Sequence, residues 1–175
     1  MLNKNGIKEG LSQGIYVDSS QDKIGENYIT VTLSNMLKTY ETPLLETTSP
    51  NPSQTILIPE TGFILEPNKL YLGSTNEYTK TDGYVPVLSG LLELATLGME
   101  IHITAGFGDN GFEGTWTLEI ICSNPTVIYP NMEIGRVYYY PLIGDDKIKY
   151  RGKYFGQIDP TESRLDKEYV KRKEK

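Results

Sequence analysis

The stretch from Thr115 to Ile120 constrains the fold of this 175-residue chain more than any other. It follows three glycines, Gly106, Gly108 and Gly111, whose spacing G-x-G-x-x-G is typical of dinucleotide-binding loops. Such a loop must open a helix, because the helix N-terminus holds the pyrophosphate. Here "TWTLEI" follows instead, with the alternation of a half-buried strand. We therefore predict a strand, an irregular glycine-rich loop and a second strand.

Glu119 is the unusual residue of this predicted strand. It lies on the face opposite Trp116, Leu118 and Ile120, and glutamate is a poor strand former that is costly to bury without a partner. A solvent-facing glutamate on an exposed sheet would explain the pattern. A carboxylate directed into a pocket, where it could act as a general base, would explain it too.

The composition is that of a globular protein with a full core. Hydrophobic residues make up 38% and charged residues 23% of the 175 positions. No apolar run approaches the ~20 residues that span a bilayer, and the start "MLNKNGIKEG" does not resemble a signal peptide, so we expect a cytoplasmic protein without a membrane partner. A net charge of −6 argues against a nucleic-acid partner. The basic end, residues 167–175, is expected to be frayed and solvated.

Counting ligands argues against metal chemistry. The chain has one cysteine, Cys122, and one histidine, His102, whereas zinc-dependent base deaminases need a cluster of such ligands beside their glutamate. A lone cysteine forms no internal disulfide and agrees with a reducing compartment. No nucleophile elbow accompanies His102, so we interpret it as a structural residue.

The remaining pattern is mostly β. A short helix is predicted at 7–14, closed by Gly14, and a helical turn or two within 88–99. Many short strands at near-regular spacing favour a sandwich, jelly roll or distorted barrel. The candidate strands are 26–35, 54–60, 61–67, 69–78, 100–104, 115–120, 126–130, 134–142 and 148–157.

Several of these segments together resemble the dCTP deaminases of the dUTPase-like superfamily. The most specific are "DNGFEGTWTLEI" (109–120) and the "GKYFGQ" spacing (152–157), and the resemblance extends over nearly the whole chain. It implies a dUTPase-like distorted jelly roll or β-barrel with short helices, as a single domain over 1–175 with an N-terminal helix (1–14) and a C-terminal tail (158–175). It also implies a homotrimer with sites between subunits, and deamination of dCTP without zinc. The 13 tyrosines suit such interfaces.

The resemblance also assigns residues to roles. Glu119 takes the place of the catalytic glutamate that activates water, and Asp109 the place that faces the deoxyribose. Lys153 and Gln157 match positions that close over the nucleotide from the C-terminal segment, and Thr96 stands at a ligand-binding position. No metal or other cofactor is expected on protein side chains, although Mg²⁺ can accompany a phosphate ligand.

The chain departs from the family at the phosphate end. Leu91, Leu92 and Glu93 replace an Arg-Ser-Ser run, and Thr96 replaces an arginine; together those residues cradle the phosphates in the family. Thr30 stands where the family usually has an aspartate. A triphosphate would therefore lose several charge-assisted hydrogen bonds.

Three functions follow as alternatives. The first is a protein that binds or sequesters a nucleotide-derived ligand, as viral nucleotide sponges do, with dCTP deamination lost. The second is an active zinc-independent dCTP deaminase of pyrimidine nucleotide metabolism, with or without dUTPase activity, that forms dUTP or dUMP. The third is a trimeric scaffold with a vestigial pocket. Retention of Asp109, Glu119, Lys153 and Gln157 argues against the scaffold, because an unused pocket does not need that combination.

Overall fold

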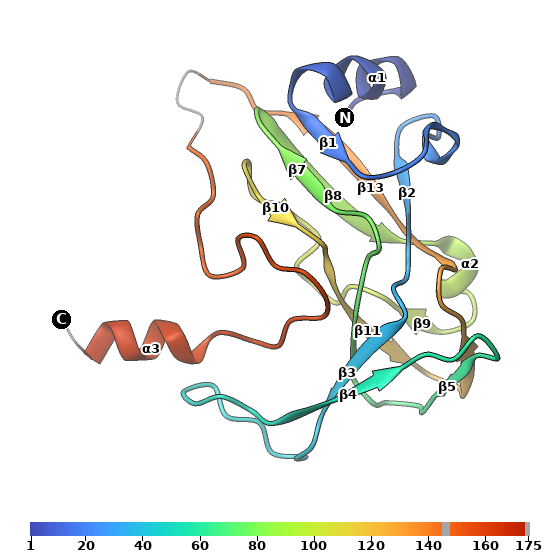
Figure 1. The fold of residues 1–175 in the computed structure, drawn as a ribbon, viewed down its shortest axis with the longest axis vertical. Helices are drawn as coiled ribbons and strands as arrows, with labels where there is room; N and C mark the ends of the chain where they lie inside the picture. Colours follow the sequence, from blue (N-terminus) through green and yellow to red (C-terminus); the bar gives the residue numbers. More distant parts are fainter. Residues whose placement is uncertain (145–147, 174–175) are drawn as a thin grey trace.

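The computed structural model describes residues 1–144 and 148–173, and it confirms a mostly β chain (Figure 1). The strands within residues 1–144 form four sheets, with the orders β1-β7-β10, β4-β3-β6-β11-β9, β12-β5 and β2-β13-β8. All of their pairings are antiparallel. The strands are β1 (Ile15–Val17), β2 (Ile29–Thr32), β3 (Met36–Tyr40), β4 (Ser53–Leu57), β5 (Phe63–Leu65), β6 (Tyr71–Ser74), β7 (Thr79–Thr81), β8 (Tyr84–Gly90), β9 (Met99–Glu100), β10 (Glu113–Gly114), β11 (Thr117–Cys122), β12 (Thr126–Ile128) and β13 (Glu133–Pro141).

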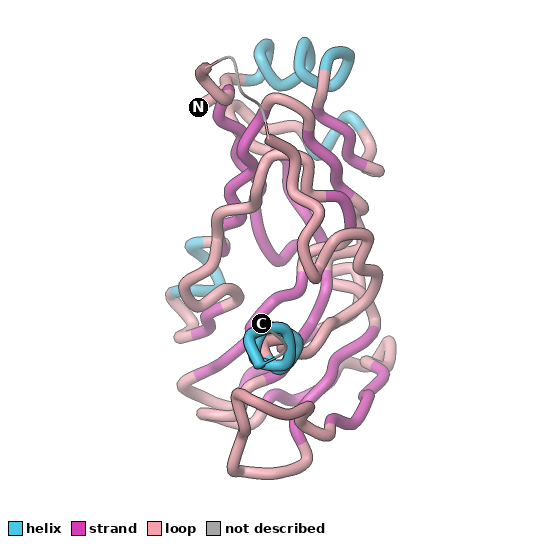
Figure 2. Tube along the Cα trace, turned by 90° about the vertical axis from the view of Figure 1, so that its left-hand side faces the viewer, coloured by secondary structure: helices cyan, strands magenta, loops and turns pink. Residues whose placement is uncertain are grey.

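Helices lie at the periphery of the sheets. α1 (Lys4–Gln13) begins after Asn3, whose side chain accepts a hydrogen bond from the Gly6 amide, and ends at Gly14. The 3₁₀ turn η1 (Gln21–Lys23) and the four-residue α2 (Leu92–Ala95) are short. α3 (Asp166–Lys173) projects from the sheets and is seen end-on in Figure 2. The expected frayed end is thus helical as far as residue 173.

Period-2 alternation builds the core. In β11, Leu118 and Ile120 are fully buried while Glu119 on the opposite face stays partly exposed, as the alternation predicts. β13 buries Val137 and Tyr139 in the same way, and it pairs with both β2 and β8. Burial of such apolar surface drives the sheets together. β11 is thereby fixed between β6 and β9.

The glycines of the G-x-G-x-x-G pattern serve close packing. The loop that contains them lies against β8, where the Leu88 amide donates to the Gly106 carbonyl at 2.7 Å. A Cβ at Gly106 would lie 2.7 Å from the Leu88 carbonyl oxygen, and one at Gly108 would lie 2.6 Å from the Trp116 ring. Gly111 has a φ of +82°, which favours glycine. The backbone therefore needs these glycines for reasons unrelated to a phosphate.

Some segments differ from the sequence predictions. Residues 148–157 are not a strand, because Gly156 has a φ of +72° and the segment turns at 152–156. The predicted strand at 100–104 is reduced to β9, after which the chain bends. β3 was not expected, since the sequence pattern suggested turn residues at its start.

Candidate functional site

A cavity of about 540 Å³ opens beside β11. Its wall combines residues of β11, the glycine-rich loop and the C-terminal segment (residues 148–165). This segment runs past the sheets toward α3 in Figure 1. Most of its lining is aromatic or aliphatic, with a few polar groups between, as is usual for small-molecule sites. The lining residues include Tyr40, Leu72, His102, Asp109, Phe112, Trp116, Thr117, Glu119, Tyr150, Tyr154, Gln157, Thr161 and Ser163.

Glu119 contributes the carboxylate of this cavity, and His102 holds it. The Glu119 side chain is 29% exposed and the His102 side chain 8%. Nδ1 of His102 contacts Oε2 of Glu119, while Nε2 of His102 lies 2.8 Å from the carbonyl oxygen of Ala105. Both ring nitrogens are therefore engaged, and the carboxylate is oriented by a nearly buried ring.

A nitrogen of the imidazole ring donates or accepts a hydrogen bond according to the tautomer, whereas a carboxylate oxygen accepts. Glu119 therefore lies beside a group with which it can exchange a proton.

Aromatic rings form the rigid wall of the cavity. Nε1 of Trp116 donates to Oγ1 of Thr79 at 3.0 Å, which fixes the indole. Phe112 packs against Trp116 with ring centroids 5.4 Å apart, and Tyr150 extends the group at 6.3 Å from Phe112. The His102 ring meets Trp116 edge-on at 6.5 Å. A flat heteroaromatic ligand would find apolar faces here.

Gln157 brings the C-terminal segment to the cavity. Its amide nitrogen donates to the Thr115 carbonyl at 2.9 Å and to Oγ1 of Thr117 at 3.3 Å. Its Oε1 is buried and has no hydrogen-bond partner among the described residues. Burying an acceptor without a partner is costly, so this oxygen is suited to a donor on a ligand.

Glu162 anchors the same segment to the sheet. It accepts a hydrogen bond from Nζ of Lys38 on β3 at 2.8 Å and another from Oγ of Ser53 on β4. Burial raises the pKa of Glu162, but these hydrogen bonds outweigh it and hold the pKa below its ordinary value. The Thr161 amide also donates to Oγ1 of Thr117 at 3.2 Å. Protein contacts therefore hold the segment against the cavity.

The structure gathers three of the five expected site residues. Asp109, Glu119 and Gln157 line the cavity, with Asp109 exposed in the glycine-rich loop. Lys153 does not line it and instead pairs with Glu168 of α3, a contact that raises the pKa of Lys153. Thr96 lies outside it as well, exposed at the end of α2 with its hydroxyl donating to the Glu93 carbonyl at 3.0 Å. The ligand-binding roles of all five remain predictions.

Sequence reasoning missed the contribution of His102. We interpreted it as a structural residue because it lies in an alternating segment and no partner is visible along the chain. Its partner is on a strand that pairs with its own region, since β9 pairs with β11. The only sequence signal that could have suggested this contact is that "EIH" and "LEI" both alternate as strands do and could therefore pair.

Two further properties bear on the kind of site. Among residues 1–144 and 148–173, no group of three or more His, Cys, Asp or Glu side chains is arranged to hold a metal ion. No helix in the same part of the chain is both long and apolar enough to cross a membrane.

Comparison with known proteins gives a consistent result. Residues 1–142 match the family model described as dCTP deaminase-like. The chain is 42% identical over 172 residues to a protein of Clostridium beijerinckii named "dCTP deaminase, dUMP-forming", covering 98% of this chain and 99% of that one. A protein of the same name from Leptospira biflexa is 37% identical over 173 residues, with the same shares covered.

A solved structure shares the fold. The crystal structure of 2′-deoxycytidine 5′-triphosphate deaminase from Agrobacterium tumefaciens matches with a TM-score of 0.62 at 11% sequence identity. The match covers 79% of this chain and 47% of that one, so this chain spans about half of the Agrobacterium chain. At this identity the likeness concerns the fold, and it confirms the expected dUTPase-like architecture.

Proposed function

This chain belongs to the dCTP deaminase-like family, and on that premise we propose that it binds dCTP and deaminates its cytosine ring without a metal ion. The observation that carries the proposal is the Glu119 carboxylate, which lines an aromatic-walled cavity while His102 orients it. This arrangement favours the active-enzyme alternative over loss of deamination, as do the names of the relatives.

Glu119 would act as the general base. Deamination of cytosine replaces the C4 amino group by oxygen, so a water molecule must lose protons and the leaving ammonia must gain one. Glu119 can take the proton of the attacking water, and His102 beside it can hold a proton between steps. A positioned general base contributes about 10²- to 10⁴-fold to such a rate. The apolar wall around Glu119 strengthens these charge interactions.

Gln157 and the aromatic rings would hold the base. The buried, unpartnered Oε1 of Gln157 can accept a hydrogen bond from an N–H of the ligand, such as an exocyclic amine. The rings of Phe112 and Trp116 supply apolar contact. Asp109 is an acceptor for a sugar hydroxyl at the rim.

The product would be dUMP. The relatives from Clostridium beijerinckii and Leptospira biflexa carry "dUMP-forming" in their names. For this chain, forming dUMP from dCTP requires release of ammonia and cleavage between the first two phosphates, with a second water. We propose both steps for this protein.

A second candidate is binding without turnover. It is favoured by the exposed side chains of Leu92 and Glu93, which stand where the family has serines, and by Thr96 in place of an arginine. Loss of phosphate contacts removes binding energy that would hold the base in register for attack. A protein of this kind would sequester a nucleotide.

We also propose a homotrimer. Large apolar side chains are exposed around the glycine-rich loop and α2, with Phe107 at 76% and Leu92 at 71%. Large apolar side chains left exposed in this way are suited to burial at a subunit interface. A monomer in light scattering at micromolar concentration would contradict this assembly.

An assay with dCTP separates the two candidate functions. The purified full chain is incubated with dCTP, and dUTP, dUMP, ammonia and diphosphate are followed by chromatography and mass spectrometry. We expect dUMP at ordinary enzymatic rates. Binding of dCTP by calorimetry with no product over hours would instead select sequestration. Mass spectrometry of small molecules released from the freshly purified protein identifies any other retained ligand.

A further inference from the structure

A second cavity, of about 670 Å³, lies between the end of β8, α2, β9 and β13. Among the described residues that line it, Arg136 is the only lysine or arginine. The other lining side chains are mostly aliphatic, together with the hydroxyl of Ser89 and the carboxylate of Glu100. A guanidinium that lines a cavity and has a buried Nε without an acceptor is suited to an anionic partner, because a buried donor left unpaired is costly.

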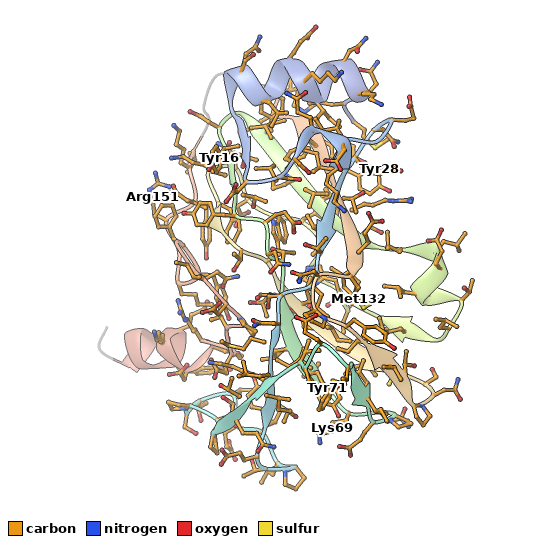
Figure 3. All side chains as sticks on the ribbon, turned by 45° about the vertical axis from the view of Figure 1, so that its right-hand side comes forward. Tyr16, Tyr28, Lys69, Tyr71, Met132 and Arg151 are labelled. Carbon is orange, nitrogen blue, oxygen red and sulfur yellow. The ribbon has the colours of Figure 1, made fainter. Side chains whose placement is uncertain are left out.

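The part of the chain that the structure describes gives Arg136 no such partner. Its side chain makes no hydrogen bond or ion pair with any residue in 1–144 or 148–173, and its Nε is buried without an acceptor. Its guanidinium lies over the ring of Tyr28, and the guanidinium carbon is 4.2 Å from the ring centroid. Tyr28 is labelled near the start of β2 in Figure 3. Stacking on the ring orients the planar guanidinium, but the face of the ring offers no oxygen acceptor to its N–H groups.

The neighbouring strands supply hydroxyls beside Arg136. On β13, Arg136 lies directly opposite Ser89 of β8 and Thr30 of β2. Residues opposite each other in antiparallel strands present their side chains on the same face of the sheet. Ser89 also lines the cavity, so a hydroxyl and a guanidinium face the same space. Such a pair suits a phosphate group, whose oxygens accept from both.

The two cavities share a wall. His102, which holds Glu119 in the first cavity, is also a lining residue of the second. A nucleotide carries its base at one end and its phosphates at the other. The two cavities differ correspondingly in the chemical groups that they offer to a ligand. One offers aromatic faces and a carboxylate, and the other offers a cation.

We propose that Arg136, with Ser89, binds phosphate oxygens of the nucleotide and so takes over phosphate recognition from the replaced residues at 91–93. This inference rests on the proposed function, because it names the residue that anchors that ligand. A planar guanidinium can give two parallel hydrogen bonds to a phosphate, which an ammonium cannot.

Calorimetry with ligands of increasing phosphate number tests the proposal. The full chain and Arg136→Met are titrated with deoxycytidine, dCMP, dCTP and inorganic tripolyphosphate. We expect Arg136→Met to lower the affinity for dCTP by roughly 10- to 100-fold, the range for loss of charged hydrogen bonds, and to leave deoxycytidine unchanged. Lys8→Met, which removes an exposed positive charge from α1, is the control for net charge and should change neither.

Arg136→Lys keeps the charge if the methionine variant does not fold. Arg136→Lys should lower the affinity for dCTP several-fold, because the fork geometry of the guanidinium is lost, and should leave the affinity for deoxycytidine unchanged. Equal affinity of wild type and variant for dCTP would overturn the proposal. So would a parallel loss for deoxycytidine with an altered oligomeric state, since Arg136 would then be an assembly residue. Wild-type protein that binds dCTP through Arg136 but makes no product leaves this inference standing and removes the deaminase function.

Discussion

The two cavities of this protein differ in how their polar groups are supported. In the cavity at Glu119, two polar side chains are held by the protein: His102 contacts the Glu119 carboxylate, and the Thr115 carbonyl accepts a hydrogen bond from the Gln157 amide nitrogen. In the cavity at Arg136, the cation has a ring beside it and no protein acceptor among the described residues. The first resembles a preorganised reaction site, and the second offers a guanidinium to which an anionic ligand could bind.

The reacting end and the anchoring end of a nucleotide site can therefore change separately. Glu119 is fixed by the register of β11 against β6, where Glu119 lies opposite Leu72. The proposed anchoring end includes the short α2 and its flanks, where Leu92 and Glu93 are exposed and the packing of the single chain depends little on their identity. Substitutions there cost the fold of the single chain little, whereas substitutions of Leu118 or Ile120, the buried neighbours of Glu119, disturb the core.

Glu119→Gln tests whether the cavity at Glu119 is the reacting end, and we expect its effect to be larger than that of any other variant. We expect dCTP turnover to fall by about 10²- to 10⁴-fold, because the amide cannot act as a base. Binding of dCTP and the melting temperature should change little, since the amide keeps the shape of the side chain. Glu60→Gln, at an exposed position, serves as the control. Turnover that survives in Glu119→Gln means that another group activates the water.

Replacing His102 tests the support of Glu119. His102→Phe removes both ring hydrogen bonds and should lower turnover by up to about 100-fold, the cost of a misplaced catalytic group. His102→Asn keeps a donor near the position of Nδ1 and should recover part of the rate. A readout beyond rate is the pH profile of kcat, whose shape should differ between wild type and His102→Phe. Two variants that match the wild type in rate and profile would leave His102 a purely structural residue.

Restoring family residues at 92, 93 and 96 tests whether this part of the chain contacts the phosphates. The triple variant Leu92→Ser, Glu93→Ser, Thr96→Arg changes exposed positions only, removes an acid and adds a guanidinium. We expect dCTP affinity to rise by about tenfold, the effect of one added charged hydrogen bond, without a change for deoxycytidine. Adding Leu91→Arg should instead destabilise the fold, because Leu91 is 8% exposed in the core. Calorimetry and thermal unfolding measure the two effects.

The smallest effect is expected at the anchor of the C-terminal segment. Hydrogen bonds lower the folded-state pKa of Glu162 below its ordinary value of 4.5, so its contribution is present above that pH and is lost as the pH falls through the lowered pKa. Glu162→Gln should make residues 148–165 a few-fold more sensitive to protease at pH 7, and should remove the extra sensitivity that the wild type gains in acid. Identical acid dependence in both proteins would exclude this anchor as its cause.

Local patterns predicted the parts of the molecule that depend on neighbours in sequence. Alternation in 115–120 located β11 and singled out Glu119, because a side chain's face follows from its parity in a strand. Contacts between strands could not be predicted from local patterns. His102 contacts Glu119 because their strands pair, and Arg136 lies over the Tyr28 ring because of the register between β2 and β13. The strand expected at 148–157 failed because tertiary hydrogen bonds, such as Tyr150 to Asn110 at 2.7 Å, outweigh local propensity.

The anchor at Glu162 also sets when the cavity can be completed. Lys38 and Glu162 are separated by 124 positions, and the cavity residues Thr161 and Ser163 flank the latter. During synthesis, the sheet that carries Glu119 can assemble long before these residues leave the ribosome, because its strands end at Cys122. The wall of the cavity is therefore among the last parts that the chain can close, and a truncated chain would carry its carboxylate in an open, solvent-filled groove.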